Sequence, residues 1–116
     1  MNFLFVCTGN VSRSPAAEAV LRQITSGIHK ARSAGISPFC PRPISREDVR
    51  WADVVAVMEV DHRAFIVERW PEVAPKVRVL EIEDRYHRHD AVLLHLLEEK
   101  LGTLLAEIET GGMIGS

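Results

Sequence analysis

Three structural signals follow one another in the stretch Asn2-Phe3-Leu4-Phe5-Val6-Cys7-Thr8-Gly9-Asn10-Val11-Ser12-Arg13-Ser14-Pro15. Residues 2–6 form an almost unbroken apolar run, which is typical of a strand buried on both faces of a parallel sheet. Polar and turn-forming residues then interrupt the run. Ser14 followed by Pro15 resembles an N-cap and the first residue of a helix. The stretch therefore predicts a strand, a tight loop and a helix in direct succession.

The remainder of the chain repeats this alternation. Further strands are expected at residues 28–34, 54–58 and 77–82, and further helices at residues 45–52, 61–70 and 93–108. Residues 35–43 contain three prolines and are expected to form a loop. Strands that alternate with helices imply right-handed crossovers and a parallel sheet. We predict an α/β single-domain three-layer sandwich, with a four-stranded parallel sheet of flavodoxin-like order and helices on both faces.

The composition is ordinary for a soluble globular protein. The 116 residues predict one domain over residues 1–110, followed by a flexible tail at residues 111–116. A net charge of -2 provides no general attraction to nucleic acid or to anionic membranes. Any anionic ligand must therefore be bound by a local site.

The N-terminal region and the cysteines favour a cytoplasmic location. No apolar run approaches the ~18 residues of a membrane span, and the N-terminus lacks the basic flank of a signal peptide. Cys7 and Cys40 are too few for a disulfide framework, and a reducing compartment would keep them as thiols or as a transient redox pair.

Cys7 and Arg13 lie at the two ends of the predicted loop. A loop of this length can direct successive backbone N–H groups inward as an anion-binding nest, together with the free N–H groups of the following helix. The forked guanidinium of Arg13 can hold two phosphate oxygens. The same donors, with the hydroxyl of Ser14, would stabilise a thiolate at Cys7 that can attack phosphorus directly. The pattern predicts a phosphate site that requires no metal or other cofactor.

The residues inside this loop are expected to contact the phosphate. The predicted substrate-binding residues are Thr8, Gly9, Asn10, Val11, Ser12 and Ser14. Gly9 and Asn10 tolerate a positive φ, and the Asn10 side chain can bond the loop's own backbone. In the alternative interpretation, Cys7 is a small buried apolar residue and Arg13 a surface charge.

Residues 6–19 resemble the signature of the low-molecular-weight protein tyrosine phosphatases, which reads Val-Cys-x-Gly-Asn-x-Cys-Arg-Ser-Pro-x-Ala-Glu-Ala. This chain departs from it chiefly at Ser12, where many members carry a second cysteine. The family's Ser-Ala-Gly is present as Ser33-Ala34-Gly35, and its Asp-Pro-Tyr loop is matched by Asp84-Arg85-Tyr86. The similarity spans most of the chain, although the chain is shorter than typical members.

The resemblance implies a role for each matching residue. Cys7 would be the nucleophile, Arg13 the phosphate and transition-state binder, Ser14 a stabiliser of the thiolate, Asn10 a loop-shaping residue and Asp84 the general acid. In the family the second loop cysteine can form a protective disulfide with the nucleophile. Its replacement by serine in this chain leaves only one other cysteine, at position 40, as a partner.

The sequence offers several candidates for the proton donor and for the walls of the pocket. Asp84 is the preferred general acid. Asp90 is the alternative, with the N-cap of the last helix as its competing role, and Glu83 is a third candidate. Tyr86 and Phe39 fall on the two loops expected to flank the site, where an aromatic face could pack on a phosphotyrosine ring. Other residues in this region make the mouth basic: Arg85, His87, Arg88 and His89.

The predicted function is that of a phosphomonoester hydrolase, with protein tyrosine phosphatase as the preferred activity, and two other functions compete with it. An arsenate reductase could use the same anion loop with external thiols, and a non-catalytic module could bind an oxyanion or a phosphopeptide.

The expected partners are a phosphorylated protein or a small phosphomonoester, with phosphate, sulfate or vanadate as site ligands. Neither nucleic acid nor a membrane is expected as a partner. His29, His62 and His95 are interpreted as ordinary surface or helix residues.

Overall fold

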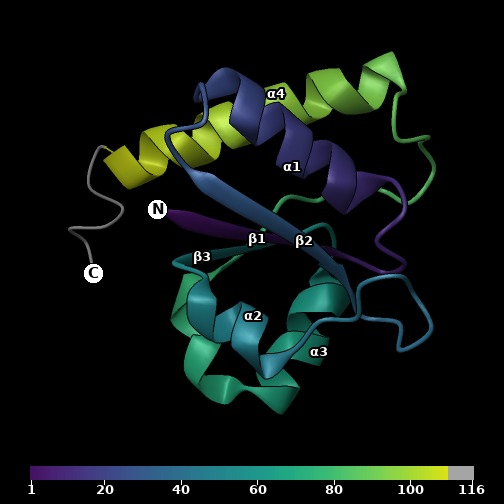
Figure 1. Ribbon diagram of the computed structural model, residues 1–116, viewed down its shortest axis with the longest axis vertical. Coiled ribbons are helices and arrows are strands. Elements are labelled where there is room, and N and C mark those ends of the chain that lie inside the picture. Colours follow the sequence, from purple (N-terminus) through teal and green to yellow (C-terminus); the bar gives the residue numbers. More distant parts are fainter. Residues whose placement is uncertain (110–116) are drawn as a thin grey trace.

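A four-stranded parallel sheet with the strand order β2-β1-β3-β4 forms the middle layer of the structure (Figure 1). The computed structural model describes residues 1–109. The strands are β1 (Asn2–Cys7), β2 (Lys30–Gly35), β3 (Val54–Val57) and β4 (Val77–Val79). The predicted α/β fold and its parallel sheet are confirmed.

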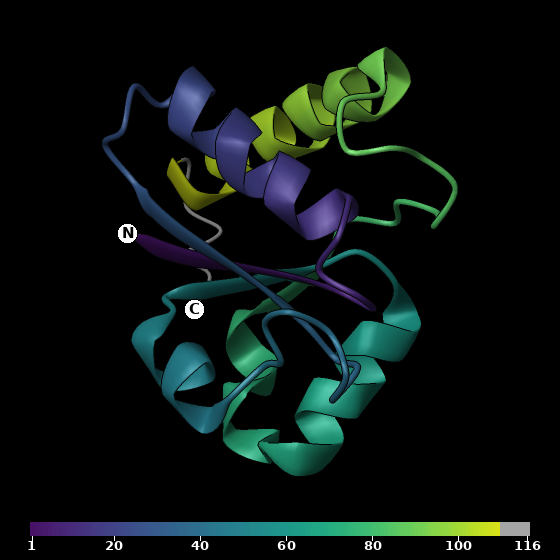
Figure 2. The same ribbon diagram turned by 45° about the vertical axis from the view of Figure 1, so that its right-hand side comes forward.

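Helices cover both faces of the sheet (Figure 2). One face carries α1 (Arg13–Ile24) and α4 (Ala91–Glu107), and the other carries α2 (Arg46–Trp51), α3 (Val60–Arg69) and the short 3-10 helix η1 (Pro71–Lys76). A capping box between Ser45 and Asp48 starts α2, within the helix expected at residues 45–52. α3 ends at Arg69, with Trp70 as its C-cap, immediately before Pro71, which cannot continue a helix.

Strand β1 lies at the centre because its side chains are apolar on both faces. Phe3 and Phe5 belong to the core cluster under α1 and α4, which includes the leucine stripe of α4. Leu4 and Val6 belong to the second cluster, under α2 and α3. All four side chains are fully buried. The alternation of the two sets follows from the two-residue period of a strand.

The fourth strand ends earlier than predicted. It stops at Val79, because Glu81 adopts a φ of 57° that breaks the extended geometry. The chain nevertheless stays beside β3, since Leu80 N donates to Val57 O and Ile82 N donates to Met58 O, both at 2.8 Å. This irregular continuation brings residues 82–84 to the carboxyl end of the sheet.

Two further expectations concern the chain as a whole. The tail predicted at residues 111–116 lies outside the described residues. Within residues 1–109, no helix combines the length and the apolar character needed to cross a membrane.

Candidate functional site

The candidate site lies at the carboxyl end of β1, where the order of the parallel strands reverses. β1 pairs with β2 on one side and with β3 on the other. The loop at residues 8–12 leaves β1 at this point and leads directly into α1 (Figure 1). Ligands of open α/β sheets bind at such positions, because no crossover connection covers the crevice.

Cys7 is the last residue of β1, and its side chain is buried. Its sulfur lies 3.0 Å from Ser14 Oγ and 3.2 Å from the backbone nitrogen of Asn10, which donates to it. The Asn10 N–H therefore donates to the sulfur from the loop, and a hydroxyl that can also donate lies within hydrogen-bond distance in the first turn of the helix. Such donors stabilise a thiolate relative to a thiol.

Ser14 is not the N-cap of α1, so that prediction is wrong. The helix begins one residue earlier, at Arg13, and Ser12 occupies the N-cap position without a side-chain cap bond. The Ser14 hydroxyl instead contacts the sulfur of Cys7 and donates to Asn10 Oδ1 at 2.9 Å. Its position inside the first helical turn directs the hydroxyl into the loop rather than onto the helix end.

Asn10 gives the loop its bend. It adopts a φ of 52°, in the left-handed region where asparagine is among the better-tolerated residues. Gly9 does not use a positive φ. Because the Asn10 nitrogen faces Cys7 while its side chain accepts from Ser14, this one residue joins the loop to the helix.

Arg13 is only 2% exposed, and its charge is balanced within the site. Nη1 donates to Glu59 Oε2 at 2.5 Å and to the carbonyl oxygen of Ile82 at 2.7 Å. Nη2 lies 3.7 Å from Asp84 Oδ2. The guanidinium is thus fixed by residues from α3 and from the segment after β4, two regions far apart in the sequence.

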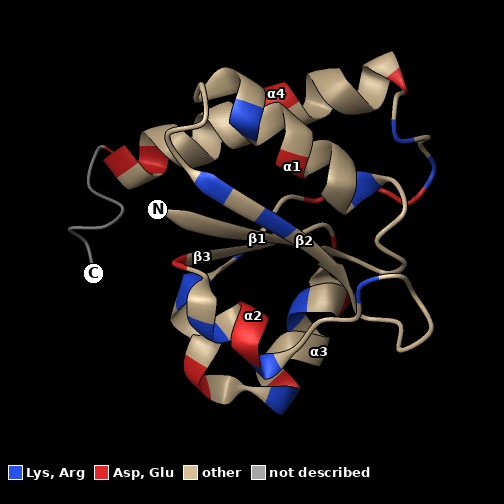
Figure 3. Cartoon of the chain, in the orientation of Figure 1, with Lys and Arg blue, Asp and Glu red and all other residues tan. Residues whose placement is uncertain are grey.

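Of the acid candidates, the structure brings Asp84 to Arg13. The side chain of Asp84 is 66% exposed, so it can reach solvent and a ligand at once. Asp90 has the competing role that we considered: it is the N-cap of α4, and its Oδ1 accepts from Val92 N at 2.8 Å. Acidic and basic residues are interspersed along the segment that carries both aspartates (Figure 3).

The aromatic residues differ in their surroundings. Tyr86 is half-buried and packs against the core cluster under α1 and α4, with the Arg85 guanidinium 5.2 Å from its ring centre. Phe39 is 95% exposed. Both stay predictions as ligand contacts, and Tyr86 already has a packing role.

His62 is a residue that the sequence interpretation missed. It lies in α3, as the helix alternative expected, but it is not a surface residue, because its side chain is only 2% exposed. Its Nε2 lies 3.0 Å from Thr8 Oγ1, and its Nδ1 accepts from Glu59 N at 3.0 Å. Burial lowers the pKa of His62, the charge of Arg13 lowers it further, and nearby carboxylates oppose the shift. The sequence did contain one signal for this role, the Glu-x-x-His spacing of Glu59 and His62 just after a strand. This spacing is typical of a capping box, although glutamate is a rare N-cap residue.

Gly35 permits a close approach of the neighbouring strand to the loop. It pairs with Cys7 in the sheet register. A Cβ added at Gly35 would lie 2.7 Å from Cys40 Sγ and 2.7 Å from the backbone oxygen of Thr8. Both cysteines are free thiols.

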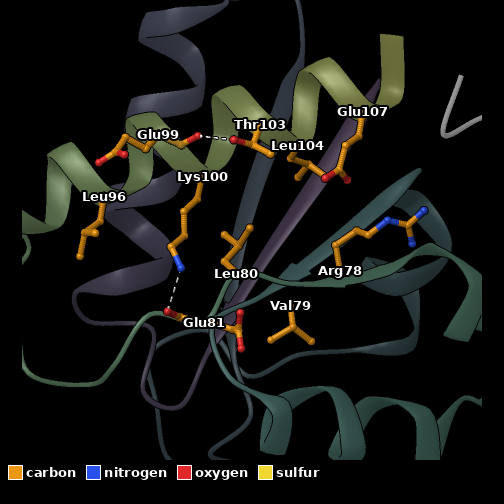
Figure 4. A pocket seen from close by; sticks show the side chains of 10 residues that line it. All are labelled: Arg78, Val79, Leu80, Glu81, Leu96, Glu99, Lys100, Thr103, Leu104 and Glu107. Carbon is orange, nitrogen blue, oxygen red and sulfur yellow. Dashed lines mark hydrogen bonds between the residues drawn. The ribbon is translucent and has the colours of Figure 1, made fainter. Parts of the chain in front are cut away.

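Residues 1–109 were considered for a metal site and for cavities apart from the phosphate loop. No group of three or more His, Cys, Asp or Glu side chains in this part of the chain is arranged to hold a metal. A cavity of about 350 Å³ lies between β4 and α4, where Lys100 Nζ donates to the backbone oxygen of Glu81 at 3.1 Å (Figure 4). None of the predicted site residues lines this cavity, so it is separate from the candidate site.

Known proteins match this chain in sequence. Residues 2–39 match the family described as low molecular weight phosphotyrosine protein phosphatase. A protein-arginine-phosphatase of Geobacillus stearothermophilus is 30% identical over 67% of this chain and 68% of its own length. The low molecular weight protein-tyrosine-phosphatase Wzb of Escherichia coli K12 is 32% identical over 75% of this chain and 79% of its own length.

Solved structures match the fold. The YwlE arginine phosphatase from Geobacillus stearothermophilus has a TM-score of 0.76 at 26% identity and covers 99% of this chain, with 97% of its own chain aligned. Wzb from Escherichia coli K30, in complex with phosphate, has a TM-score of 0.76 at 25% identity, with 91% and 96% of the two chains aligned. The resemblance seen in the sequence is thereby confirmed.

Proposed function

Because this chain belongs to the low-molecular-weight protein tyrosine phosphatase family and is a cysteine-dependent phosphatase, we propose that it acts through a phosphocysteine on Cys7. Arg13 binds the phosphate and Asp84 is the general acid. The observation that carries this proposal is the buried sulfur of Cys7, which is faced by the hydroxyl of Ser14 and the backbone nitrogen of Asn10.

In the first step the Cys7 thiolate attacks phosphorus, and the bond from phosphorus to the leaving group breaks. The backbone N–H groups of residues 8–12 and the guanidinium of Arg13 neutralise the charge that spreads over the three equatorial oxygens. Protonated Asp84 gives its proton to the leaving oxygen or nitrogen. The products are the free leaving group and the phosphocysteine.

In the second step water replaces the sulfur. The Asp84 carboxylate accepts a proton from water as the oxygen attacks phosphorus, and the sulfur leaves as a thiolate. The hydroxyl of Ser14 is placed to donate to that thiolate, because its oxygen already lies 3.0 Å from the sulfur. Inorganic phosphate is released and the enzyme regains its starting charge.

The substrate is a phosphorylated protein, and we propose phosphotyrosine as the substrate residue. Relatives named for tyrosine and for arginine dephosphorylation both match this chain, so the arginine phosphatases support phosphoarginine as a second candidate. Tyr86 would pack the face of its ring on an aromatic substrate. We also place the enzyme in the cytoplasm, since a nucleophilic thiol must stay reduced and both cysteines are free.

One set of assays tests this function. The purified protein and its Cys7→Ser variant are given para-nitrophenyl phosphate, a phosphotyrosine peptide and a phosphoarginine peptide, and phosphate release is measured. We expect turnover that requires Cys7, with the phosphotyrosine peptide preferred. Faster turnover of the phosphoarginine peptide would instead establish the second candidate. Turnover that survives in Cys7→Ser would contradict the mechanism, and arsenate-dependent consumption of added thiols without phosphate release would favour a reductase.

A further inference from the structure

We propose that His62 is a positioning residue which, as a neutral imidazole protonated on Nε2, holds both ends of the phosphate loop against the start of α3. The inference rests on the proposed roles of Cys7 and Arg13. It concerns a side chain that is not expected to touch the substrate.

The hydrogen bonds determine the proton's position. The backbone nitrogen of Glu59 can only donate, so Nδ1 of His62 accepts this bond and carries no proton. The proton of the neutral ring is therefore on Nε2, which lies 3.0 Å from Thr8 Oγ1. Because Thr8 accepts from the ring, its own hydroxyl hydrogen remains available to another acceptor, such as a phosphate oxygen.

His62 reaches both ends of the loop. At the first end it bonds Thr8, the residue next to the nucleophile. At the second end it acts through Glu59, whose backbone nitrogen donates to Nδ1 of His62 and whose backbone oxygen accepts from the backbone nitrogen of His62, both at 3.0 Å. The carboxylate of the same Glu59 holds Nη1 of Arg13. One helix start thus fixes the geometry of Cys7 and Arg13 relative to each other, which is the geometry that phosphate binding requires.

Protonation of His62 would undo this arrangement. A charged ring donates from both nitrogens, so Nδ1 would face the N–H group of Glu59 and that bond would be lost. The charged groups around the ring are Arg13 from α1, Glu59 and Asp61 from α3, and Asp84 from the segment after β4. Thr8, from the loop after β1, is uncharged. Burial and Arg13 together lower the pKa of His62, so the neutral form is the one favoured near pH 7.

If His62 only capped α3, its substitution would have different effects from those expected of a residue that positions Cys7 and Arg13. A cap affects the stability of α3 and leaves the turnover of folded molecules unchanged. A positioning residue also affects kcat/KM and its pH dependence. Glutamine can replace both bonds, since its amide oxygen accepts and its amide nitrogen donates, and it has no charge to gain in acid.

The experiment compares the full chain with His62→Gln, His62→Ala and the matched control His95→Gln. His95 is 72% exposed on α4 and bonds only Glu99 among the described residues. We expect His62→Ala to lower kcat/KM at pH 7.5 by at least tenfold while the protein stays folded by circular dichroism. We expect His62→Gln to stay within about threefold of wild type at that pH, and to lose less activity than wild type between pH 7 and pH 5.5. His95→Gln should follow wild type throughout.

Wild-type activity in folded His62→Ala, or parallel pH profiles for wild type and His62→Gln, would overturn the proposal.

Two readouts keep this test separate from the proposed function. Nitrogen NMR of the His62 ring reports the protonated nitrogen directly, and a proton on Nδ1 would contradict the proposal. Binding of vanadate should weaken at least tenfold in His62→Ala even if no substrate is turned over. Failure of wild-type turnover with retained vanadate binding would refute only the proposed function, whereas equal vanadate binding by wild type and His62→Ala would refute only the role of His62.

Discussion

The hydroxyl of Ser14 lies 3.0 Å from the sulfur of Cys7, and the helix that carries Ser14 begins only one residue before it. The sulfur and the hydroxyl are thus held by a strand and a helix that meet at the loop, and not by the loop alone. This relationship holds the hydroxyl within donating distance of a thiolate, which receives its hydrogen when the hydroxyl turns from Asn10 Oδ1 to the sulfur.

We predict that Ser14→Ala lowers kcat/KM by about ten- to a hundredfold, because a hydrogen bond to a charged group contributes about 1.5–3 kcal/mol. The rate of Cys7 alkylation by iodoacetamide should fall in parallel at pH 6. Ser12→Ala is the control, since Ser12 makes no side-chain cap bond and its change should leave both rates near wild type. Equal effects of the two substitutions would contradict the role of Ser14.

For Arg13 we predict that a positive charge alone is insufficient. Arg13→Lys keeps a partner for Glu59 but cannot also hold two phosphate oxygens as a planar fork. We expect kcat/KM to fall about a hundredfold or more and vanadate inhibition to weaken strongly. Arg88→Lys, on an exposed residue of the segment before α4, should change neither quantity. Near-normal kinetics in Arg13→Lys would show that bidentate binding is not needed.

The proton donor can be identified through the leaving group. Asp84→Asn should lower kcat about a hundredfold for phenyl phosphate and far less for para-nitrophenyl phosphate, whose leaving group needs little protonation. Asp90→Asn should leave both rates unchanged, because asparagine caps a helix as well as aspartate does. If Asp90→Asn showed the leaving-group dependence and Asp84→Asn did not, the two assignments would be exchanged.

The structure also explains which features could be predicted from the sequence. The apolar run at residues 2–6 predicted a buried strand correctly, because burial on both faces needs only local apolar residues. The end of α1 that faces the site was predicted wrongly, since a Ser-Pro pair is also compatible with the first turn of a helix. In that turn, the contact with Cys7 decides where the hydroxyl points.

His62 and Glu59 could not be assigned for a related reason. The role of His62 depends on Thr8, which lies 54 positions earlier in the sequence. The role of Glu59 depends on Arg13, which lies 46 positions earlier. A single sequence has no pattern that joins such distant residues. Strand β4 was predicted too long, because the positive φ of Glu81 interrupts a stretch whose apolar residues continue to Ile82.

The lowered pKa of His62 predicts a pH dependence of stability. In the unfolded chain the ring has a pKa of about 6.5, so the unfolded state binds more protons than the folded state at pH values just below 6.5. The contribution of neutral His62 to the free energy of unfolding is therefore complete above pH 6.5 and declines as the pH falls below it. Urea unfolding from pH 5 to pH 8 should show a steeper decline in wild type than in His62→Gln, because His29, whose pKa is also lowered by burial, is present in both. Curves that stay parallel would contradict the lowered pKa.

The last prediction concerns the space beside the loop. Gly35→Ala would place a Cβ 2.7 Å from both Cys40 Sγ and the backbone oxygen of Thr8, and 3.0 Å from the backbone nitrogen of Asn10. The sulfur can move with its side chain, but the two backbone atoms belong to the phosphate loop and cannot shift without changing it. We therefore expect kcat/KM to fall at least tenfold and the free energy of unfolding to fall by about 1–3 kcal/mol, the usual cost of overpacking.

Gly102→Ala provides the matched control for the same chemical change. Gly102 lies within α4, and a Cβ there would meet nothing within 4 Å. Alanine should raise the free energy of unfolding by about 0.5–1 kcal/mol and leave kcat/KM unchanged, because it restricts the unfolded chain and favours the helix. If Gly35→Ala also kept wild-type kinetics, then the loop could shift far enough to make room for the added methyl group. In that case the close approach of β2 would not constrain the position of Thr8 relative to Cys7.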